Sequence, residues 1–217
     1  MNTSATTRSA RLWSAALLLL LPLLTGCIGA VAVGAGAGAL VMVDRRSSET
    51  IVTDEGIELR AETRINEKFE FKIHINVTSF NRMVLLTGEV PTEAAKTEAE
   101  KIARSVPNVK SITNELAIAG NSSFGGRSND SYITSKVKAR FIDANKFNVS
   151  SVKVVTEAGV VFLMGVVTQA EADAAVEIAR TTAGVQKVVR VFEIVTPEQA
   201  RSMEASANGS STPAKAP

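Results

Sequence analysis

Residues 84–90 read VLLTGEV, and residues 161–167 read VFLMGVV. Both stretches place valine, leucine, glycine and valine at the same relative positions. The likeness continues on both sides, because residues 102–104 and 178–180 both read Ile-Ala-Arg and Asp54 corresponds to Asp130. The matching residues lie 76 or 77 positions apart throughout. Such a constant spacing predicts two tandem copies of one small domain.

Each copy has the same expected order of elements: helix, strand, strand, helix and strand. The first helices are expected at 54–66 and 130–143, the hairpins at 74–80 with 83–90 and at 151–156 with 160–167, the second helices at 92–105 and 169–182, and the closing strands at 112–118 and 188–194. Asp54 is expected to be the N-cap of its helix. The fold class is therefore α+β. Each copy is an αββαβ sandwich with a three-stranded mixed sheet, in which the middle and last strands are parallel.

Three motifs point to a known family, and they are more specific in the second copy than in the first. Both hairpins end in Leu-x-Gly-x-Val, both second helices are rich in alanine, and residues 184–188 of the second copy read Gly-Val-x-x-Val. These motifs resemble the BON domain, which implies a module that binds phospholipid or another protein. Asn108 stands where glycine is usual, and asparagine tolerates the left-handed conformation that glycine takes there. Gly88 and Gly165 fall inside strands, where a glycine indicates a bulge or a close backbone approach.

The N-terminal stretch has the layout of an export signal. Two arginines and no acidic residue precede an apolar run that ends in Leu-Thr-Gly-Cys at residues 24–27. This end resembles the lipobox of bacterial lipoproteins. The resemblance implies cleavage before Cys27, a diacylglycerol on its sulfur and a fatty acyl chain, such as palmitate, on its amino group. Ile28 follows the cysteine in place of aspartate, which in lipoproteins implies the outer membrane, at its periplasmic face. The alternative is an ordinary signal peptide with a stray cysteine.

These patterns predict a domain organisation with six parts. They are a lipoprotein signal peptide (1–26), the lipidated cysteine with a glycine- and alanine-rich spacer (27–53), BON domain 1 (54–120), a linker (121–129), BON domain 2 (130–196) and a disordered tail (197–217). As a helix, the apolar residues 28–43 would span about 24 Å, less than the roughly 30 Å of a hydrocarbon core. We therefore expect the spacer to lie along the membrane, with re-insertion beside the lipids as the alternative.

The composition argues against several classes of function. Without residues 1–26 the chain carries 22 basic and 22 acidic side chains, so no overall field favours nucleic acid. One histidine and one cysteine are too few for the common zinc sites, so no metal site and no cofactor are predicted. The lone His74 is expected to be a surface or half-buried structural residue. Because no nucleophile elbow, P-loop or dinucleotide motif is present, an enzyme is not expected.

The candidate binding residues lie on the first helix of the second copy. Ile133, Val137 and Phe141 recur every four residues and should face the sheet. On the adjacent stripe an aromatic residue stands beside basic residues, which suits an anionic phospholipid surface. The BON resemblance implies that this helix binds anionic phospholipid through its aromatic residue, usually tryptophan. The candidate lipid-binding set is Tyr132, Ser135, Lys136, Lys138, Ala139 and Arg140.

Two hypotheses about function follow. The first is a non-enzymatic outer-membrane lipoprotein that binds anionic phospholipid through BON domain 2 and supports envelope integrity, with the division site as one place of action. The second is a tethered adaptor that docks on proteins of an outer-membrane assembly machine. From the residues alone, we favour the alternative in which this basic helix face is only solvated and its tyrosine packs at the domain interface. The family resemblance reverses that preference and favours lipid binding. The first helix of domain 1 leans acidic and should be repelled by an anionic bilayer.

Overall fold

The computed structural model describes residues 44–70, 72–120 and 124–209. These residues belong to one compact unit. The expected signal peptide, Cys27, residues 28–43 of the expected spacer, residues 121–123 of the linker and residues 210–217 of the tail lie outside the described residues. What the sequence indicates for those segments stays a prediction.

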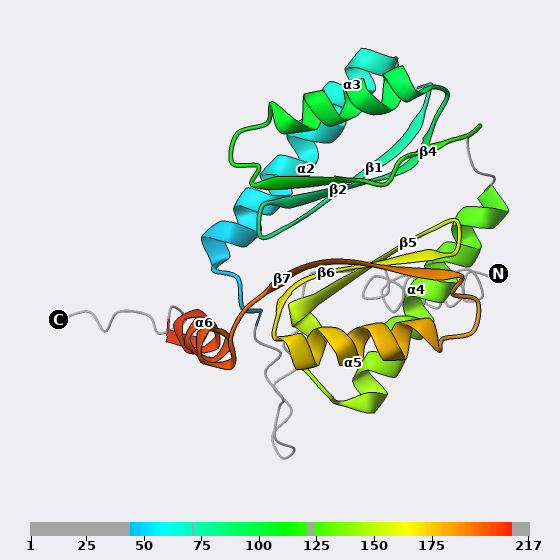
Figure 1. Cartoon of the computed structure of the whole chain (residues 1–217). Helices are drawn as coiled ribbons and strands as arrows, with labels where there is room; N and C mark the ends of the chain where they lie inside the picture. Colours follow the sequence, from blue (N-terminus) through cyan, green and yellow to red (C-terminus); the bar gives the residue numbers. More distant parts are fainter. Residues whose placement is uncertain (1–43, 71, 121–123, 210–217) are drawn as a thin grey trace, which may run out of the picture. The chain divides into compact units, whose positions relative to one another are not determined.

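The first domain has the expected order of elements (Figure 1). α2 (Ser48–Phe69) precedes the hairpin of β1 (His74–Phe80) and β2 (Met83–Val90), which is followed by α3 (Glu93–Arg104), β3 (Ser111–Asn114) and β4 (Ala117–Ile118). β1 pairs antiparallel with β2, whereas β3 and β4 both pair parallel with β2. α2 and α3 cover the same face of this sheet.

The second domain repeats this arrangement. α4 (Phe124–Ala144) and the short 3-10 helix η2 (Val149–Ser151) precede β5 (Val152–Glu157), β6 (Val160–Val167), α5 (Gln169–Arg180) and β7 (Lys187–Ile194). β5 pairs antiparallel with β6, and β6 pairs parallel with β7. The mixed sheet and the parallel crossover are therefore confirmed in both domains.

The closing strand of the first domain differs from the expected continuous strand over residues 112–118. It breaks between β3 and β4, where Leu116 is buried in the core of its domain. The Leu116 backbone N–H donates to the Asn114 side chain at 3.3 Å, while the Glu115 N–H still donates to the Leu86 carbonyl of β2 at 2.9 Å. The burial of one leucine thus interrupts the strand without detaching it from the sheet.

Gly88 and Gly165 occupy equivalent places in the two hairpins. Gly88 pairs with Ile75 of β1, and Gly165 pairs with Val152 of β5. A Cβ at Gly88 would lie 2.1 Å from the His74 carbonyl oxygen, and one at Gly165 would lie 2.3 Å from the Ser151 carbonyl oxygen. The expected close backbone approach is confirmed, because any side chain at either position would collide with main chain.

Left-handed backbone recurs at matching places in the repeat. The two-residue turns at 81–82 and 158–159 both have positive φ, as tight hairpins with a right-handed twist require. Asn108 has φ 72° where Gly184 has φ 99°. Asparagine therefore takes the conformation that glycine takes in the second domain, as predicted.

The expected N-cap role of Asp54 is wrong. α2 begins at Ser48, and its N-cap is Ser47, whose side chain accepts a hydrogen bond from the Thr50 N–H. Asp54 lies inside the helix and is buried, and so is its counterpart Asp130 inside α4. α2 therefore includes residues 48–53 of the expected spacer, and α4 includes residues 124–129 of the expected linker.

Both aspartates instead hold the hairpin turns. Asp54 accepts hydrogen bonds from the backbone N–H groups of residues 81 and 82, at 2.8 and 2.7 Å. Asp130 accepts from the N–H groups of residues 158 and 159, at 2.9 and 2.8 Å. Each carboxylate thus satisfies two turn donors that the sheet cannot pair, and it fixes the first helix against the hairpin.

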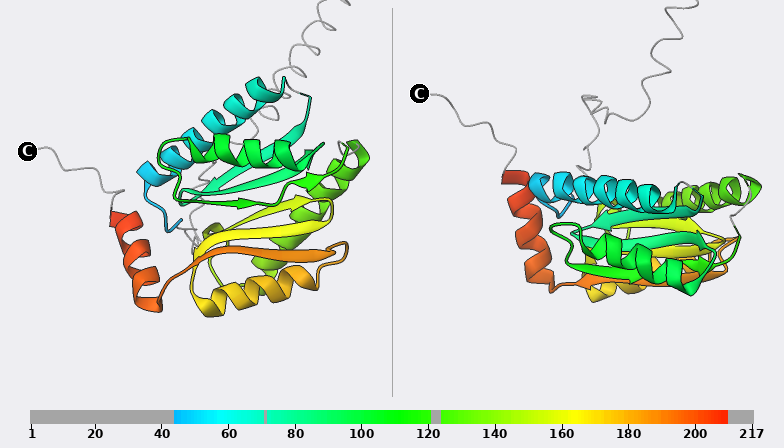
Figure 2. Two further views of the ribbon diagram at one scale, coloured as in Figure 1. Left: turned by 45° about the horizontal axis from the view of Figure 1, so that its top comes forward. Right: turned by 90° about the horizontal axis from the view of Figure 1, so that it is seen from above.

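Each domain has its own hydrophobic core between helices and sheet, and a third core lies between the two sheets. The third core contains Phe80, Met83, Leu85, Phe162, Met164, Val166 and Val191. All residues of β2 are buried, because one face of the strand meets the helices of its domain and the other meets the second sheet. Figures 1 and 2 show the two sheets between the helices of the two domains.

The expected disorder of the tail is wrong for residues 197–209, which form α6 (Pro197–Gly209). Ala200 is buried, and Glu204 accepts a hydrogen bond from Arg45 at 2.9 Å. Arg45 also donates two hydrogen bonds to Glu171 of α5, at 2.7 and 2.8 Å. The helix is thus held by an arginine far away in the sequence, which composition and periodicity do not indicate.

Candidate membrane-binding face and interdomain carboxylate cluster

The inner face of α4 anchors the second domain. Ile133, Val137 and Phe141 are buried in the domain core, which confirms the expected stripe. The Phe141 ring meets the Phe147 ring edge-on, with centroids 5.0 Å apart. Because this stripe faces the sheet, the opposite face of the helix is available to solvent.

The outer face of α4 presents most of the candidate lipid-binding residues. Tyr132 is 63% exposed, and Ser135, Lys138 and Ala139 are also exposed. Ile142, which sequence analysis did not select, is 55% exposed on the same helix. Ten residues separate Ile142 from Tyr132, which places the two side chains about a quarter turn apart around the helix and both away from the buried stripe. This spacing could have identified Ile142 from the sequence.

The exposure of Tyr132 bears on the alternative interpretation. Packing at the domain interface would bury this ring, and the ring is mostly solvent-exposed. The Lys136 ammonium lies 4.5 Å from the centre of the Tyr132 ring, in a cation–π contact. The tyrosine is therefore oriented by its neighbour on α4.

Lys136 and Arg140 also connect α4 to the end of α5 through hydrogen bonds. Arg140 donates hydrogen bonds to the Ile178 carbonyl at 2.9 Å and to the Thr182 hydroxyl at 2.8 Å, and Lys136 donates to the Ala183 carbonyl. These acceptors lie in the last turn of α5 and just after it, where carbonyl groups lack helical partners and cations are favoured. Both residues are half-buried as a result.

Lys138 is the more accessible cation of this face. It is exposed, and no ion pair between described residues involves Lys136, Lys138 or Arg140. α4 carries four basic and two acidic residues, whereas α2 carries three basic and six acidic residues. The two domains therefore differ in the charge of their first helix, as the sequence indicates.

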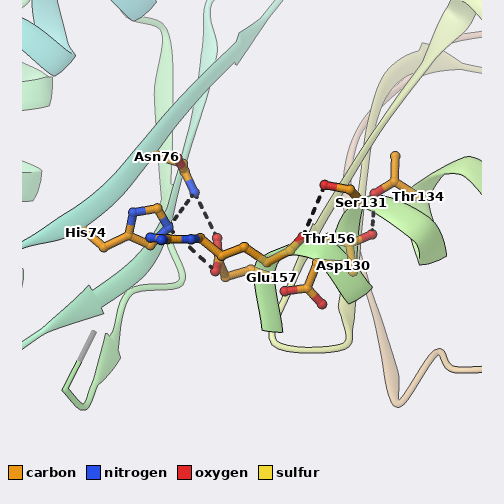
Figure 3. A pocket seen from close by; sticks show the side chains of 8 residues that line it. His74, Asn76, Asp130, Ser131, Thr134, Thr156 and Glu157 are labelled. Atoms are coloured by element: carbon orange, nitrogen blue, oxygen red, sulfur yellow. Dashed lines mark hydrogen bonds and ion pairs between the residues drawn. The ribbon is translucent and has the colours of Figure 1, made fainter. Parts of the chain in front are cut away.

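A second cluster joins the two domains, and sequence analysis did not predict it. The Asn76 side chain on β1 donates to Glu157 of β5 at 2.9 Å and lies 3.3 Å from the His74 ring. The His74 Nε2 atom lies 3.9 Å from the Glu157 carboxylate. His74 itself is half-buried, as expected. Figure 3 shows these three side chains beside a pocket of about 320 Å³, which also has Asp130, Ser131, Thr134 and Thr156 in its wall.

Burial sets the electrostatics of this pocket. Removal from water raises the pKa of Glu157 above its ordinary value, and the nearby carboxylates of Glu89 and Asp130 add to that increase. The hydrogen bond from Asn76 and the nearby His74 act in the opposite direction and do not reverse it. The cluster is therefore an acidic site from which water is partly excluded.

Comparison with known proteins gives the family. The BON domain model matches residues 57–120 and 129–196. The chain is 37% identical over 172 residues to "Outer membrane lipoprotein DolP" of Haemophilus influenzae, an alignment that covers 78% of this chain and 89% of that protein.

Two further relatives are similar over shorter stretches. The "21 kDa hemolysin" of Actinobacillus pleuropneumoniae is 38% identical over 70% of this chain and 80% of its own length. The "Osmotically-inducible protein Y" of Escherichia coli is 36% identical over 52% of this chain and 58% of its own length. Among the described residues, no helix is both long and apolar enough to cross a membrane.

Proposed function

The chain belongs to the BON-domain family, and from this premise we propose that it binds anionic phospholipid through α4 of the second domain. The protein is a non-enzymatic lipoprotein, anchored by Cys27 at the periplasmic face of the outer membrane, and it supports the integrity of the cell envelope there. The similarity to an outer membrane lipoprotein over 89% of that protein supports this location.

One observation carries the lipid proposal: Tyr132 and Ile142 are exposed apolar side chains on a helix whose outer face also presents Lys138. Aromatic and aliphatic side chains gain free energy when they leave water for the acyl boundary, at about 25 cal/mol per Å². Each basic side chain near an anionic surface adds about 1 kcal/mol. A helix with both features suits the interface between headgroups and acyl chains.

Vesicle binding tests this face. The fragment that starts at Asp44, before Arg45, should bind vesicles that contain phosphatidylglycerol and bind phosphatidylcholine vesicles much more weakly. Lys138→Glu changes the interaction by about 2 kcal/mol before screening, so binding should fall by roughly tenfold or more at low salt. Lys101→Glu, an exposed reversal on α3, is the matched control and should have little effect. Co-sedimentation measures all of these affinities.

Tyr132 tests the apolar part of the same proposal. Tyr132→Ala should weaken binding equally at low and high salt, because it removes an apolar contact and no charge. Tyr132→Trp should strengthen binding, since indole is the larger interfacial ring. Lys136 and Arg140 are unsuitable for charge reversal because a glutamate there would face the carbonyl groups of α5. Unchanged binding by both Lys138→Glu and Tyr132→Ala would disprove the α4 assignment.

The anchor has its own test. Cys27→Ala should leave an uncleaved or mislocalised precursor, because no other residue of the chain can form the thioether. Growth with a labelled fatty acid followed by immunoprecipitation measures acylation directly. If the alanine variant retains the label, the lipobox assignment is wrong.

The adaptor is the second candidate function, and one observation favours it. Val52 and Leu59 of α2 are 68% and 67% exposed, and a spacing of seven residues places them on one side of that helix. The acidic α2 suits a protein partner better than an anionic membrane. Loss of envelope integrity in Val52→Ser/Leu59→Ser, with vesicle binding intact, would favour the adaptor.

A further inference from the structure

His74, Glu89 and Glu157 bring three potential metal ligands together, and the proposed function uses none of them. His74 begins β1 and pairs with Glu89 of β2, whereas Glu157 ends β5 of the other domain. One ring nitrogen and one oxygen from each carboxylate all lie within 4.8 Å of one another. Two adjacent strands and a strand of the second domain therefore meet at one point.

Glu89 supplies an independent sign of a missing partner. The residue is only 6% exposed, and its Oε2 atom has no hydrogen-bond partner among the described residues. A buried carboxylate oxygen without a donor is costly and rare in folded proteins. One oxygen of this carboxylate lies within 4.8 Å of ligand atoms of His74 and Glu157, so the carboxylate that lacks a donor belongs to the cluster.

Nε2 is the ring nitrogen of His74 that faces Asn76 and Glu157. The Nδ2 group of an asparagine can only donate, and it lies 3.3 Å from His74 Nε2. In the tautomer with an unprotonated Nε2, this nitrogen accepts from Asn76, and a metal ion would take the place of that hydrogen bond. The same nitrogen lies 3.9 Å from the Glu157 carboxylate.

We propose that His74, Glu89 and Glu157 bind a divalent first-row transition-metal ion of the zinc type. Such an ion with two carboxylates and a neutral imidazole is electrically balanced, and it gives the unsatisfied Glu89 oxygen a partner. Metal–ligand distances of about 2.0–2.2 Å require each side chain to move by about 1 Å. One nitrogen and two oxygens favour this class over calcium and magnesium, which prefer oxygen ligands alone.

The neighbouring pocket gives the ion access and leaves room for water as a further ligand. His74 and Glu157 both line this pocket of about 320 Å³. Arg127 also lines it, and its charge opposes the entry of a cation. The ion would link β1 and β2 of domain 1 to β5 of domain 2, so it acts as a clamp between the domains.

The test uses the mature, lipidated chain in detergent micelles, stripped of metal with a chelator. Calorimetry with ZnCl2 should give one site per chain, and zinc should raise the melting temperature. Because the sequence contains one histidine, the ring nitrogen signals in an NMR spectrum report on His74 alone, and Nε2 should shift on zinc addition. Co2+ should give visible absorption bands that zinc removes.

Matched variants separate binding from folding. Glu89→Gln keeps the shape and should weaken zinc binding at least tenfold while making the metal-free chain no less stable, since a buried charge is removed. Arg127→Gln should tighten binding, and Glu93→Gln, an exposed acid at the start of α3, should change nothing. An unshifted His74 ring at saturating zinc, or equal zinc affinity in Glu89→Gln and wild type, would refute the site. The NMR measurement needs no variant, so a misfolded substitution cannot rescue the proposal.

Discussion

Asp130 shows how much one side chain contributes to the BON fold. Asp130 lies within α4 and is buried, and its carboxylate accepts hydrogen bonds from two backbone N–H groups of the β5–β6 turn. Asp130→Ala should lower the free energy of unfolding by about 3 kcal/mol, because two donors lose a charged acceptor. Urea unfolding measures this loss. Asp143→Ala, an exposed aspartate on the same helix, should change stability by less than about 0.5 kcal/mol, and an equal loss in both variants would contradict the assigned role.

The two aspartates also differ from what their sequence positions indicate. The repeat placed Asp54 opposite Asp130, and this correspondence is correct. Their task is not the expected one, because an aspartate near a helix start is commonly a cap, whereas these two bind turn residues that lie 27 to 29 positions later in the sequence. The glycines were easier to interpret, since a glycine inside a strand commonly marks a bulge or a close approach of another backbone.

At the scale of elements, Arg45 connects the segment before α2 to α5 and α6. Burial raises the pKa of Glu171, but its hydrogen bonds and charge interaction with Arg45 outweigh this, and the pKa ends below its ordinary value of 4.5. Ionised Glu171 therefore contributes stability that is fully present above about pH 4.5 and is lost as the pH falls through the lower pKa of the folded state.

Arg45→Met should thus lower the free energy of unfolding by about 3 kcal/mol at neutral pH, since it leaves a mostly buried carboxylate unpaired. As the pH falls below 4.5 the loss should become smaller, because the stabilising charge of Glu171 is progressively lost by protonation. Urea titrations at several pH values measure both. Arg201→Met removes an exposed ion pair of α6 and should have almost no effect. A loss that does not depend on pH would show that Glu171 is not the group responsible.

Most elements were predictable, and α6 was not, for a physical reason. Strands such as β2 and β6 are mostly apolar because packing on both faces determines their residues. α6 has few apolar residues and depends on the distant Arg45. Helix existence there is decided by tertiary contact, which local sequence patterns do not encode. The outer face of α4 falls between these cases, since its spacing was readable but the α5 contacts of Lys136 and Arg140 were not.

At the scale of the whole described unit, the core between the sheets makes the two domains depend on each other. The repeat predicted two sandwiches, but it did not predict that the outer faces of their sheets pack together. The sign was present in the sequence: residues 83–86 and 160–164 are apolar at consecutive positions, as expected for strands buried on both faces. A domain separated from its partner would expose that second apolar face.

This mutual dependence predicts coupled unfolding. Ile57 is fully buried in the core of domain 1 and is not part of the core between the sheets. Ile57→Ala should cost about 2–5 kcal/mol, and it should lower hydrogen-exchange protection in β6 of domain 2 as much as in β2, because the two sheets unfold together. Ile118→Ala, an exposed substitution in domain 1, is the control and should leave both strands protected. If protection in β6 stays at the wild-type value while β2 loses it, the domains unfold independently. The core between the sheets would then contribute little to the stability of either domain.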